Sequence, residues 1–397
     1  MPLRFLTAGE SHGPVELVIV EGLPAGLPLD ADDINPDLAR RQGLNATGRP
    51  YPGASPRMKL ERDVARVLSG VMAGMTIGAP VAIQVDNNDH DKWKGKAVAP
   101  MTIPRPGHAD LTGALKYGHR DLRMSLERAS ARETTARVAA GATARKLLGA
   151  FGVRVGSYVT QIGSVRADLS RLPLDARLTA AGESEVQCPD PESSVAMVAH
   201  IQEAMRGRDT LGGVFEVVAL GVPPGLGSHV HWDRRLTGRL AQAMLSIHAM
   251  KGVEIGDAFD NAGRPGTQVQ DAIYKDPAGT LTRSTNRSGG LEGGITTGEP
   301  IVLRVAMKPI ATTLTPIDSV DLASGEPRPI EYERSDFCPV PRAGVIGEAM
   351  ACLVLADALI EKLGGDSLAE MLQRFEALRR PRLNDFDLDN TPTVFWP

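Results

Sequence analysis

An alanine-rich helical stretch, predicted over Leu126–Ala150, limits most strongly how this chain can fold. Alanine recurs on every side of the predicted helix rather than along one stripe. Small side chains all round a long helix let neighbouring elements approach on several sides, which is typical of a helix buried at the centre of a domain. Since 42% of the 397 residues are apolar, the chain can surround such a helix with a substantial core.

The other predicted elements do not alternate in the strand–helix order that a doubly wound parallel sheet requires. We therefore predict an α+β fold in which mostly antiparallel sheets cover a helical layer. No linker or repeat divides the chain, so residues 1–397 are predicted to form one domain with long functional loops. The predicted strands are Pro14–Glu21, Gly78–Val85, Ser157–Ser164, Gly213–Val222 and Pro300–Met307. The further predicted helices are Leu111–Tyr117, Ser194–Arg206, Arg234–Met250, Gly344–Leu363 and Ser367–Arg379.

Composition argues against several classes of protein. A net charge of -4 argues against a general binder of nucleic acid or of membrane surfaces. The three cysteines are far apart and lack metal-ligand spacing, so neither disulfides nor a metal site is expected. No signal peptide or membrane span is predicted, and the expected location is cytoplasmic. Arginines greatly outnumber lysines, which suits recognition of phosphate and carboxylate but equally follows from codon bias.

The loop Gly9–Gly13, with the sequence GESHG, lies between two strand-like runs. Its two glycines allow a tight turn from which Ser11 and His12 project. A histidine there can donate a proton to a leaving oxyanion near neutral pH. The alternative is a turn whose histidine only hydrogen-bonds the backbone.

The loop Arg105–Asp110, with the sequence RPGHAD, carries a second histidine, His108. Proline fixes the chain and glycine allows close approach to a ligand. The flanking Arg105 and Asp110 can set the charge and orientation of His108. Asp110 can also cap the helix that follows, and the two roles are compatible.

The start of the alanine-rich stretch carries Arg128 and Arg132, which are predicted to lie one helical turn apart with Ser130 between them. Next to the exposed N–H groups of a helix N-terminus, these side chains can grip a phosphate. The alternative is a solvated helix face on which Glu127 and Glu133 pair with the arginines.

Two later loops carry further candidates. The paired glycines of Arg287–Thr296 (RSGGLEGGIT) can cradle a phosphate or lie against a flavin, or can simply form a turn, and their spacing fits no phosphate-loop or dinucleotide motif. Lys308 can face a flavin's anionic side or its phosphate. In Arg334–Ala343, Asp336 between two arginines stays ionised and can act as a base, or can pin the loop as an ion pair.

In this order and spacing, the motifs resemble the chorismate synthase family over nearly the whole chain, with further agreement at Arg40–Gln42 and Ser246–Gly256. The resemblance implies one α+β domain with helices sandwiched between antiparallel sheets, assembled as a homotetramer. It implies a lyase that eliminates phosphate from 5-enolpyruvylshikimate 3-phosphate (EPSP) to give chorismate, by an anti-1,4-elimination that needs reduced FMN. NADPH is expected only as a reductant of the flavin, and whether this chain uses it stays open.

The resemblance also implies roles for single residues. His12 resembles the histidine that protonates the leaving phosphate, His108 the one that protonates or polarises the reduced flavin, and Asp336 the aspartate that helps to remove the C6 hydrogen. The positions that match substrate-binding residues are Ser11, Arg40, Arg49, Arg105, Ser130, Arg132 and Arg334. The positions that match flavin-contacting segments are Arg128, Ala129, Ser130, His248, Ala249, Gly293, Lys308, Pro309, Ile310, Ala311, Thr312 and Arg334.

One departure from the family pattern lies in the loop Gly43–Gly53, which replaces the family's short loop of glycine and arginine. The second arginine of that loop is therefore either Arg49 or Arg57, and Arg49 is favoured.

Other departures concern single positions. Ser335 and Phe337 replace the histidine and proline that the family usually has beside Asp336. His248 stands where the family more often has Asn, Gln or Pro, so its contact is expected to be through the backbone. Two rival classes are an FMN-dependent NAD(P)H oxidoreductase, which would consume nicotinamide, and a non-catalytic phosphometabolite-binding protein, which would release no phosphate.

Overall fold

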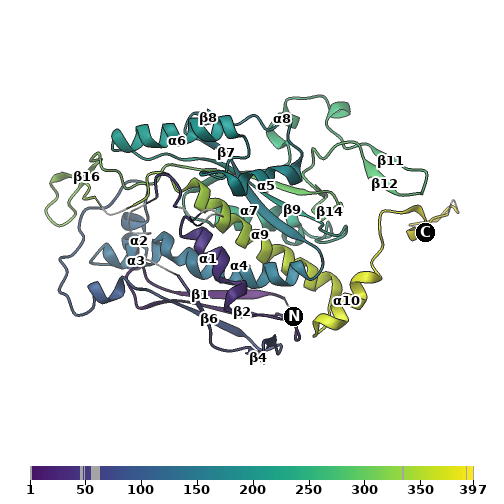
Figure 1. Cartoon of the computed structure of the whole chain (residues 1–397), viewed down its shortest axis with the longest axis horizontal. Coiled ribbons are helices and arrows are strands. Elements are labelled where there is room, and N and C mark those ends of the chain that lie inside the picture. Colours follow the sequence, from purple (N-terminus) through teal and green to yellow (C-terminus); the bar gives the residue numbers. More distant parts are fainter. Residues whose placement is uncertain are drawn as a thin grey trace.

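Two antiparallel sheets enclose a layer of helices in the computed structural model (Figure 1). The structure describes residues 2–44, 48, 50–54, 63–332, 335–389 and 391–396. Every pair of neighbouring strands within the two sheets runs antiparallel. This arrangement confirms the predicted α+β class, with antiparallel sheets covering a helical layer.

The first sheet has four strands in the order β1 (Arg4–Gly9), β2 (Val15–Glu21), β6 (Val81–Asp86) and β3 (Ala65–Val67). Alternate residues of β2 point to opposite faces, so Val18 is buried whereas Ile19 is exposed. The strands β2 and β6 were predicted. Strand β1 corresponds to the strand-like run expected before the loop Gly9–Gly13, for which no bounds were predicted, because its half-buried and exposed positions alternate with few large apolar residues to mark them.

The second sheet has five strands in the order β10 (Met250–Ile255), β15 (Ile301–Met307), β9 (Gly213–Leu220), β7 (Arg154–Ile162) and β8 (Val165–Arg166). Its central strand β9 is buried on both faces, because α5 (Leu174–Glu183) and the segment before it cover the outer face. The predicted strands at β7, β9 and β15 are confirmed.

The remaining elements surround these sheets. Besides the two long central helices described below, the α-helices are α1 (Asn35–Arg41), α2 (Asp110–Tyr117), α3 (Arg123–Ala129), α5 (Leu174–Glu183), α6 (Pro191–Arg206), α7 (Leu236–Leu245), α8 (Ala258–Ala262) and α10 (Leu368–Glu376). Short hairpins are formed by β4 (Val71–Met72) with β5 (Met75–Thr76), β11 (Ile273–Lys275) with β12 (Leu281–Arg283), β13 (Leu291–Glu292) with β14 (Ile295–Thr296), and β16 (Asp318–Val320) with β17 (Pro327–Pro329).

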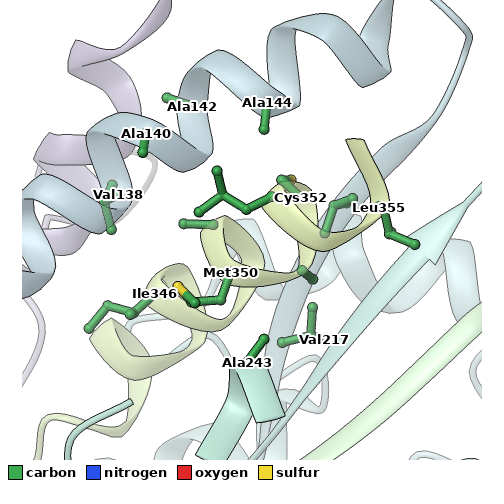
Figure 2. Close-up of a cluster of buried hydrophobic side chains, with 14 of the residues drawn as sticks. Val138, Ala140, Ala142, Ala144, Val217, Ala243, Ile346, Met350, Cys352 and Leu355 are labelled. Carbon is green, nitrogen blue, oxygen red and sulfur yellow. The ribbon is translucent and has the colours of Figure 1, made fainter. Parts of the chain in front are cut away.

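Two long helices, α4 (Thr134–Gly149) and α9 (Val340–Leu363), form the centre of the helical layer. Helix α4 packs against the first sheet and against α9, and α9 packs against the second sheet. Figure 2 shows α9 between the small side chains of α4 on one side and Val217 of β9 on the other. The buried central helix predicted from the alanines is confirmed, because residues on all sides of α4 are buried.

The two helices approach each other closely at Gly141. A Cβ atom built there would lie 2.3 Å from the Cβ of Ala349, so only glycine fits without a shift of one helix. We expect Gly141→Ala to lower the free energy of unfolding by about 1–3 kcal/mol, since overpacking outweighs the better helix propensity of alanine. Urea denaturation measures this change. The control is Gly149→Ala at the end of the same helix, where a Cβ meets nothing within 4 Å. Equal stability of the two variants would contradict this view of the helix contact.

The single helix predicted over Leu126–Ala150 is wrong in one respect, because the chain breaks at Ser130. The backbone there is extended, with φ -68° and ψ 144°, and separates α3 from the 3-10 turn Ala131–Glu133 and from α4. The Ser130 hydroxyl accepts a hydrogen bond from the Arg132 N–H and donates one to Ser11. Serine side chains compete with the helical backbone in this way, which accounts for the break.

Within the part of the chain that the structure describes, one helix, α9, is long and apolar enough to cross a membrane by length and composition alone. It is almost entirely buried inside the protein, as expected for a core helix.

Candidate active site

A cavity of about 480 Å³ lies where the helical layer meets the loops at one end of both sheets. Most of its walls come from segments that are far apart in the sequence. They are the loop after β1, the loop before α2, the break between α3 and α4, the loop between α7 and β10, the segment after β15, and the start of α9. The residues that line it are Ser11, His12, Arg41, Arg105, Gly107, His108, Ala109, Leu126, Ala129, Ser130, Ala131, Arg132, Thr134, Ile247, His248, Ala249, Met250, Met307, Lys308, Ile310, Ala311, Thr312, Ser335, Asp336, Pro339, Arg342, Ala343 and Ile346.

His12 is held at the cavity by a carboxylate from α3. Its Nδ1 lies 2.7 Å from Glu127 Oε1, and its backbone N–H donates to Glu127 Oε2 at 2.8 Å. Trp93 packs on the imidazole with ring centroids 4.1 Å apart. Burial alone would raise the pKa of Glu127, but the hydrogen bonds from His12 lower it, so the carboxylate stays ionised near neutral pH. Since Nδ1 is occupied, Nε2 is the ring nitrogen left to act on a ligand.

His108 is held in a similar way by Asp110, the first residue of α2. The His108 Nδ1 lies 2.5 Å from Asp110 Oδ1, while Arg105 Nε donates to Asp110 Oδ2 at 2.7 Å. Burial would raise the pKa of Asp110, but hydrogen bonds from Arg105 and His108 hold it well below its usual range. The N-cap of α2 is Ala109, so Asp110 does not cap this helix. Of the two roles predicted for Asp110, the structure shows the one in which it contacts His108 and Arg105.

Two arginines, Arg41 and Arg132, bring positive charge to the cavity wall. Both contact the buried carboxylate of Asp63, at 3.3 Å from Arg41 Nη1 and 2.7 Å from Arg132 Nη1. Beside them, the hydroxyl of Ser130 donates to that of Ser11 at 3.1 Å. Two neighbouring guanidinium groups are strong donors to anions, so this wall suits an anionic group such as phosphate or carboxylate.

Asp336 lies at the cavity in an ion pair with Arg342 of α9. The neighbouring Ser335 donates its hydroxyl to the Thr312 carbonyl at 3.0 Å, and the backbone of Phe337 pairs with Gly53 and Leu211. Ser335 and Phe337, which depart from the family pattern, thus fix the loop on both sides of Asp336.

The wall between α7 and the end of β15 is mostly apolar and suits a flat heteroaromatic ring. The Lys308 N–H donates to the Ala249 carbonyl, and its Nζ donates to Gly107 at 2.7 Å, which ties this wall to the histidine loop. Burial lowers the pKa of His248 to about 4 despite the opposing effect of Glu133, so the imidazole is neutral. Its buried Nδ1 has no hydrogen-bond partner among the described residues, as expected of a group that awaits a ligand.

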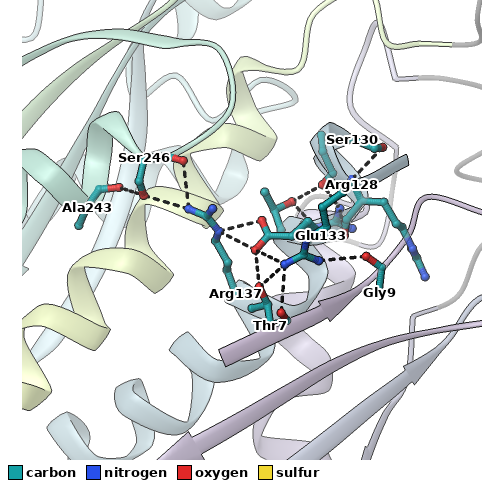
Figure 3. Close-up of polar contacts among 12 residues, drawn as sticks. Thr7, Gly9, Arg128, Ser130, Glu133, Arg137, Ala243 and Ser246 are labelled. Atoms are coloured by element: carbon teal, nitrogen blue, oxygen red, sulfur yellow. Dashed lines mark hydrogen bonds and ion pairs between the residues drawn. The ribbon is translucent and has the colours of Figure 1, made fainter. Parts of the chain in front are cut away.

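The structure brings most of the predicted site residues to this cavity, but not all. Arg128 instead donates to the carbonyls of Gly9 and Thr7 on β1, at 3.0 Å each (Figure 3). Arg128 precedes the break at Ser130 and Arg132 follows it. The two arginines therefore do not lie one turn apart on a single helix, contrary to the prediction. Gly293 lies in the turn between β13 and β14, and neither it nor Pro309 is among the described residues that line the cavity. Arg49, Arg57 and Arg334 lie outside the described residues.

Arg40 also lies outside the cavity lining, in a buried ion network. Its guanidinium binds Glu348 of α9 at 2.6 and 2.8 Å, and Arg145 of α4 binds the same carboxylate at 2.6 Å. Burial would raise the pKa of Glu348, but Arg40 and Arg145 lower it to about 2. Asp37 contacts both arginines as well. The neighbouring Arg41, which faces the opposite way on α1, lines the cavity instead.

We expect Glu348→Gln to lower the free energy of unfolding by about 3–5 kcal/mol at neutral pH, because Asp37 alone would then balance two guanidinium groups. Because the folded pKa of Glu348 is depressed, its contribution is present above the unfolded value near pH 4.5 and is lost as the pH falls towards 2. Chemical denaturation of both proteins from pH 7 to pH 3 measures this. The control is Glu361→Gln in an exposed ion pair, which should cost less than about 1 kcal/mol. A gap between wild type and Glu348→Gln that stays constant with pH would contradict the assignment.

Three residues at the site had no assigned role in the sequence. Glu127 was considered only as a partner for the neighbouring arginines, whereas it binds His12. Trp93 covers the His12 ring, and the Arg123 guanidinium lies over the Trp93 ring at 5.3 Å. Arg41 belongs to the motif Arg40–Gln42 but carries no predicted role. Their contacts join residues tens of positions apart, and no local pattern marks them.

Comparison with known proteins gives one consistent result. The family model for chorismate synthase matches residues 3–360. A chorismate synthase from Desulforudis audaxviator is 52% identical over 96% of this chain and 99% of that protein, and one from Aquifex aeolicus is 51% identical over 94% and 96%. A crystal structure of chorismate synthase is similar with a TM-score of 0.76 and 44% identity, over 95% of this chain and 97% of that one.

Proposed function

We propose that this chain, which belongs to the chorismate synthase family of lyases, eliminates phosphate from EPSP to give chorismate with the help of reduced FMN. The observation that carries the proposal is that His12 and His108, each bound through Nδ1 to a carboxylate, line the same cavity as Arg41 and Arg132. Two oriented proton donors and a cationic wall are what an elimination of phosphate requires.

The cationic wall is proposed to bind the substrate anions. EPSP carries a phosphate and two carboxylates, and Arg41, Arg132 and Arg105 are the cavity arginines best placed to bind them. The hydroxyls of Ser11 and Ser130 add hydrogen bonds to the same wall. These groups stabilise the negative charge that grows on the leaving phosphate, which is where binding energy lowers the barrier most.

His12 is proposed to give a proton to the departing phosphate. Glu127 fixes the ring through Nδ1, and Trp93 limits its rotation, so Nε2 is held for proton transfer. Glu127 also balances the charge of the imidazolium form before it gives up the proton.

The flavin is proposed to lie against the apolar wall, where the orphaned His248 Nδ1 and the backbone around Ala249, Lys308 and Ala311 fit a heteroaromatic ring. When bound, reduced FMN supplies electron density that assists cleavage of the C–O bond. His108 is proposed to hold a proton towards this ring, and the Asp336 carboxylate to help remove the hydrogen that leaves C6 of the substrate. The ion pair with Arg342 holds the Asp336 carboxylate in place.

Assembly as a homotetramer and the use of NADPH only to reduce the flavin are proposed from family membership. A cytoplasmic location is proposed from the sequence. An experiment that tests the proposal incubates the protein anaerobically with reduced FMN and EPSP, and measures phosphate and chorismate. A parallel sample with NADPH and oxidised FMN measures nicotinamide consumption. Equal phosphate and chorismate are expected. Nicotinamide consumption without phosphate release would instead favour an oxidoreductase.

A further inference from the structure

Glu16 is a buried carboxyl group that the proposed reaction does not use. It lies on β2 opposite Gly9 of β1 and Val85 of β6, and it is only 1% exposed. Neither of its carboxylate oxygens has a hydrogen-bond partner among the described residues. Buried carboxyl groups are nearly always paired or hydrogen-bonded, so an unpaired one calls for an explanation.

Its position is directly beneath the loop that carries Ser11 and His12. A Cβ atom built at Gly9 would lie 2.5 Å from Glu16 Oε2, so the carboxyl group fills the space that the glycine leaves. Residues 16, 18 and 20 of β2 are the buried face of the strand, which packs against α4. Glu16 therefore faces the start of the helical layer, where Arg132 and Glu133 lie.

The charged groups around Glu16 come from each neighbouring element. Arg132 and Glu133 belong to the turn before α4, Arg128 to α3, and Arg41 to α1. Glu133 is itself held by Thr7 at 2.8 Å and by Arg137 at 2.8 Å (Figure 3). Burial raises the pKa of Glu16 to about 7, although Arg132, Arg41 and Arg128 oppose the rise and Glu133 adds to it.

The positive field that favours ionised Glu16 comes mainly from two arginines that also line the cavity. An anion bound to Arg41 and Arg132 offsets that field and repels a second negative charge close by. Ionised Glu16 and a bound anion therefore compete for the same guanidinium groups. The group that yields is Glu16, because no hydrogen bond holds its charged form.

We propose that Glu16 is a proton acceptor coupled to substrate binding: when a phosphorylated, carboxylated substrate occupies Arg41 and Arg132, Glu16 takes up a proton from solvent. This inference rests on the proposed function for the identity of the substrate, but the coupling itself needs only an anion at the two arginines. Glu16 thereby makes substrate affinity depend on pH, with tighter binding below neutral pH. It acts through the arginines and touches neither substrate nor cofactor.

The test is calorimetric titration of the full-length protein, bound to oxidised FMN, with EPSP in buffers of different ionisation enthalpy. If the bound anion lowers the acid dissociation constant of Glu16 tenfold, wild type takes up about half a proton more per bound EPSP molecule than Glu16→Gln does at pH 7.5. Over pH 6 to pH 8, the dissociation constant of wild type is expected to rise about fivefold relative to that of Glu16→Gln. Proton release by the phosphate itself and by the histidines is common to both proteins and cancels.

Glu16→Leu is a second variant without the carboxyl group, and it should match Glu16→Gln in proton uptake. Equal proton uptake in wild type and in both variants, with parallel pH dependence of affinity, would overturn the inference. The same titration with inorganic phosphate separates this inference from the proposed function. If EPSP does not bind, the proposed function fails, and the difference in proton uptake with inorganic phosphate then decides the role of Glu16.

Discussion

Replacing His12 by alanine is expected to lower the turnover number by about 10²–10⁴-fold, the usual cost of losing a positioned general acid. The phosphate would then leave without a proton, while Arg41 and Arg132 would still bind the substrate. The Michaelis constant and the thermal unfolding temperature should therefore change little. Anaerobic assays of phosphate release, together with a melting curve, measure both properties.

A matched control for His12→Ala is His200→Ala on α6, where the ring lies outside the cavity lining and 3.4 Å from Glu203. That variant should turn over at the normal rate. A His12→Ala protein that keeps its fold and works within a few-fold of wild type would remove His12 from the proposed reaction.

Replacing His108 by alanine is also expected to lower turnover by about 10²–10⁴-fold, because the proton that this ring presents to the flavin is lost. The variant should still bind FMN, since the apolar wall around Ala249 and Lys308 is untouched. Asp110 keeps Arg105 as a partner in the variant, so the loop should stay folded. Flavin titration and anaerobic phosphate release, measured on the same preparation, separate binding from turnover.

The control for His108→Ala is His119→Ala just beyond α2, whose ring bonds Ser125 and does not line the cavity. Loss of flavin binding in His108→Ala, with normal turnover once flavin is saturating, would show that His108 only holds the cofactor.

The fold was predictable where the apolar pattern is strong. The strands at β2, β9 and β15 and the helices at α6, α9 and α10 follow from local periodicity and lie close to their predicted bounds. The break at Ser130 was not predicted, because the Ser130 hydroxyl combines a local cap on the Arg132 N–H with a hydrogen bond to Ser11, more than a hundred residues away in the sequence. Tertiary contacts of this kind override helix propensity.

The site was predictable at the level of motifs, but not at the level of contacts. The glycine-flanked loops marked His12 and His108 as candidates, and the structure places both at one cavity, while their roles stay predictions. The choice between Arg40 and Arg41 depends on which side of α1 faces α9, and two adjacent arginines carry no signal that decides it. The partner of His12 comes from Glu127, and only the folded chain brings the two together.

The proposed reaction eliminates phosphate without net oxidation of the flavin. An anaerobic experiment with EPSP in tenfold excess over reduced FMN, in which phosphate, chorismate and flavin absorbance are followed in the same sample, examines this property. We expect equal amounts of phosphate and chorismate, well in excess of the flavin, with the flavin still reduced at the end. No phosphate release from folded, flavin-bound protein, or one product molecule per flavin with the flavin oxidised, would contradict it.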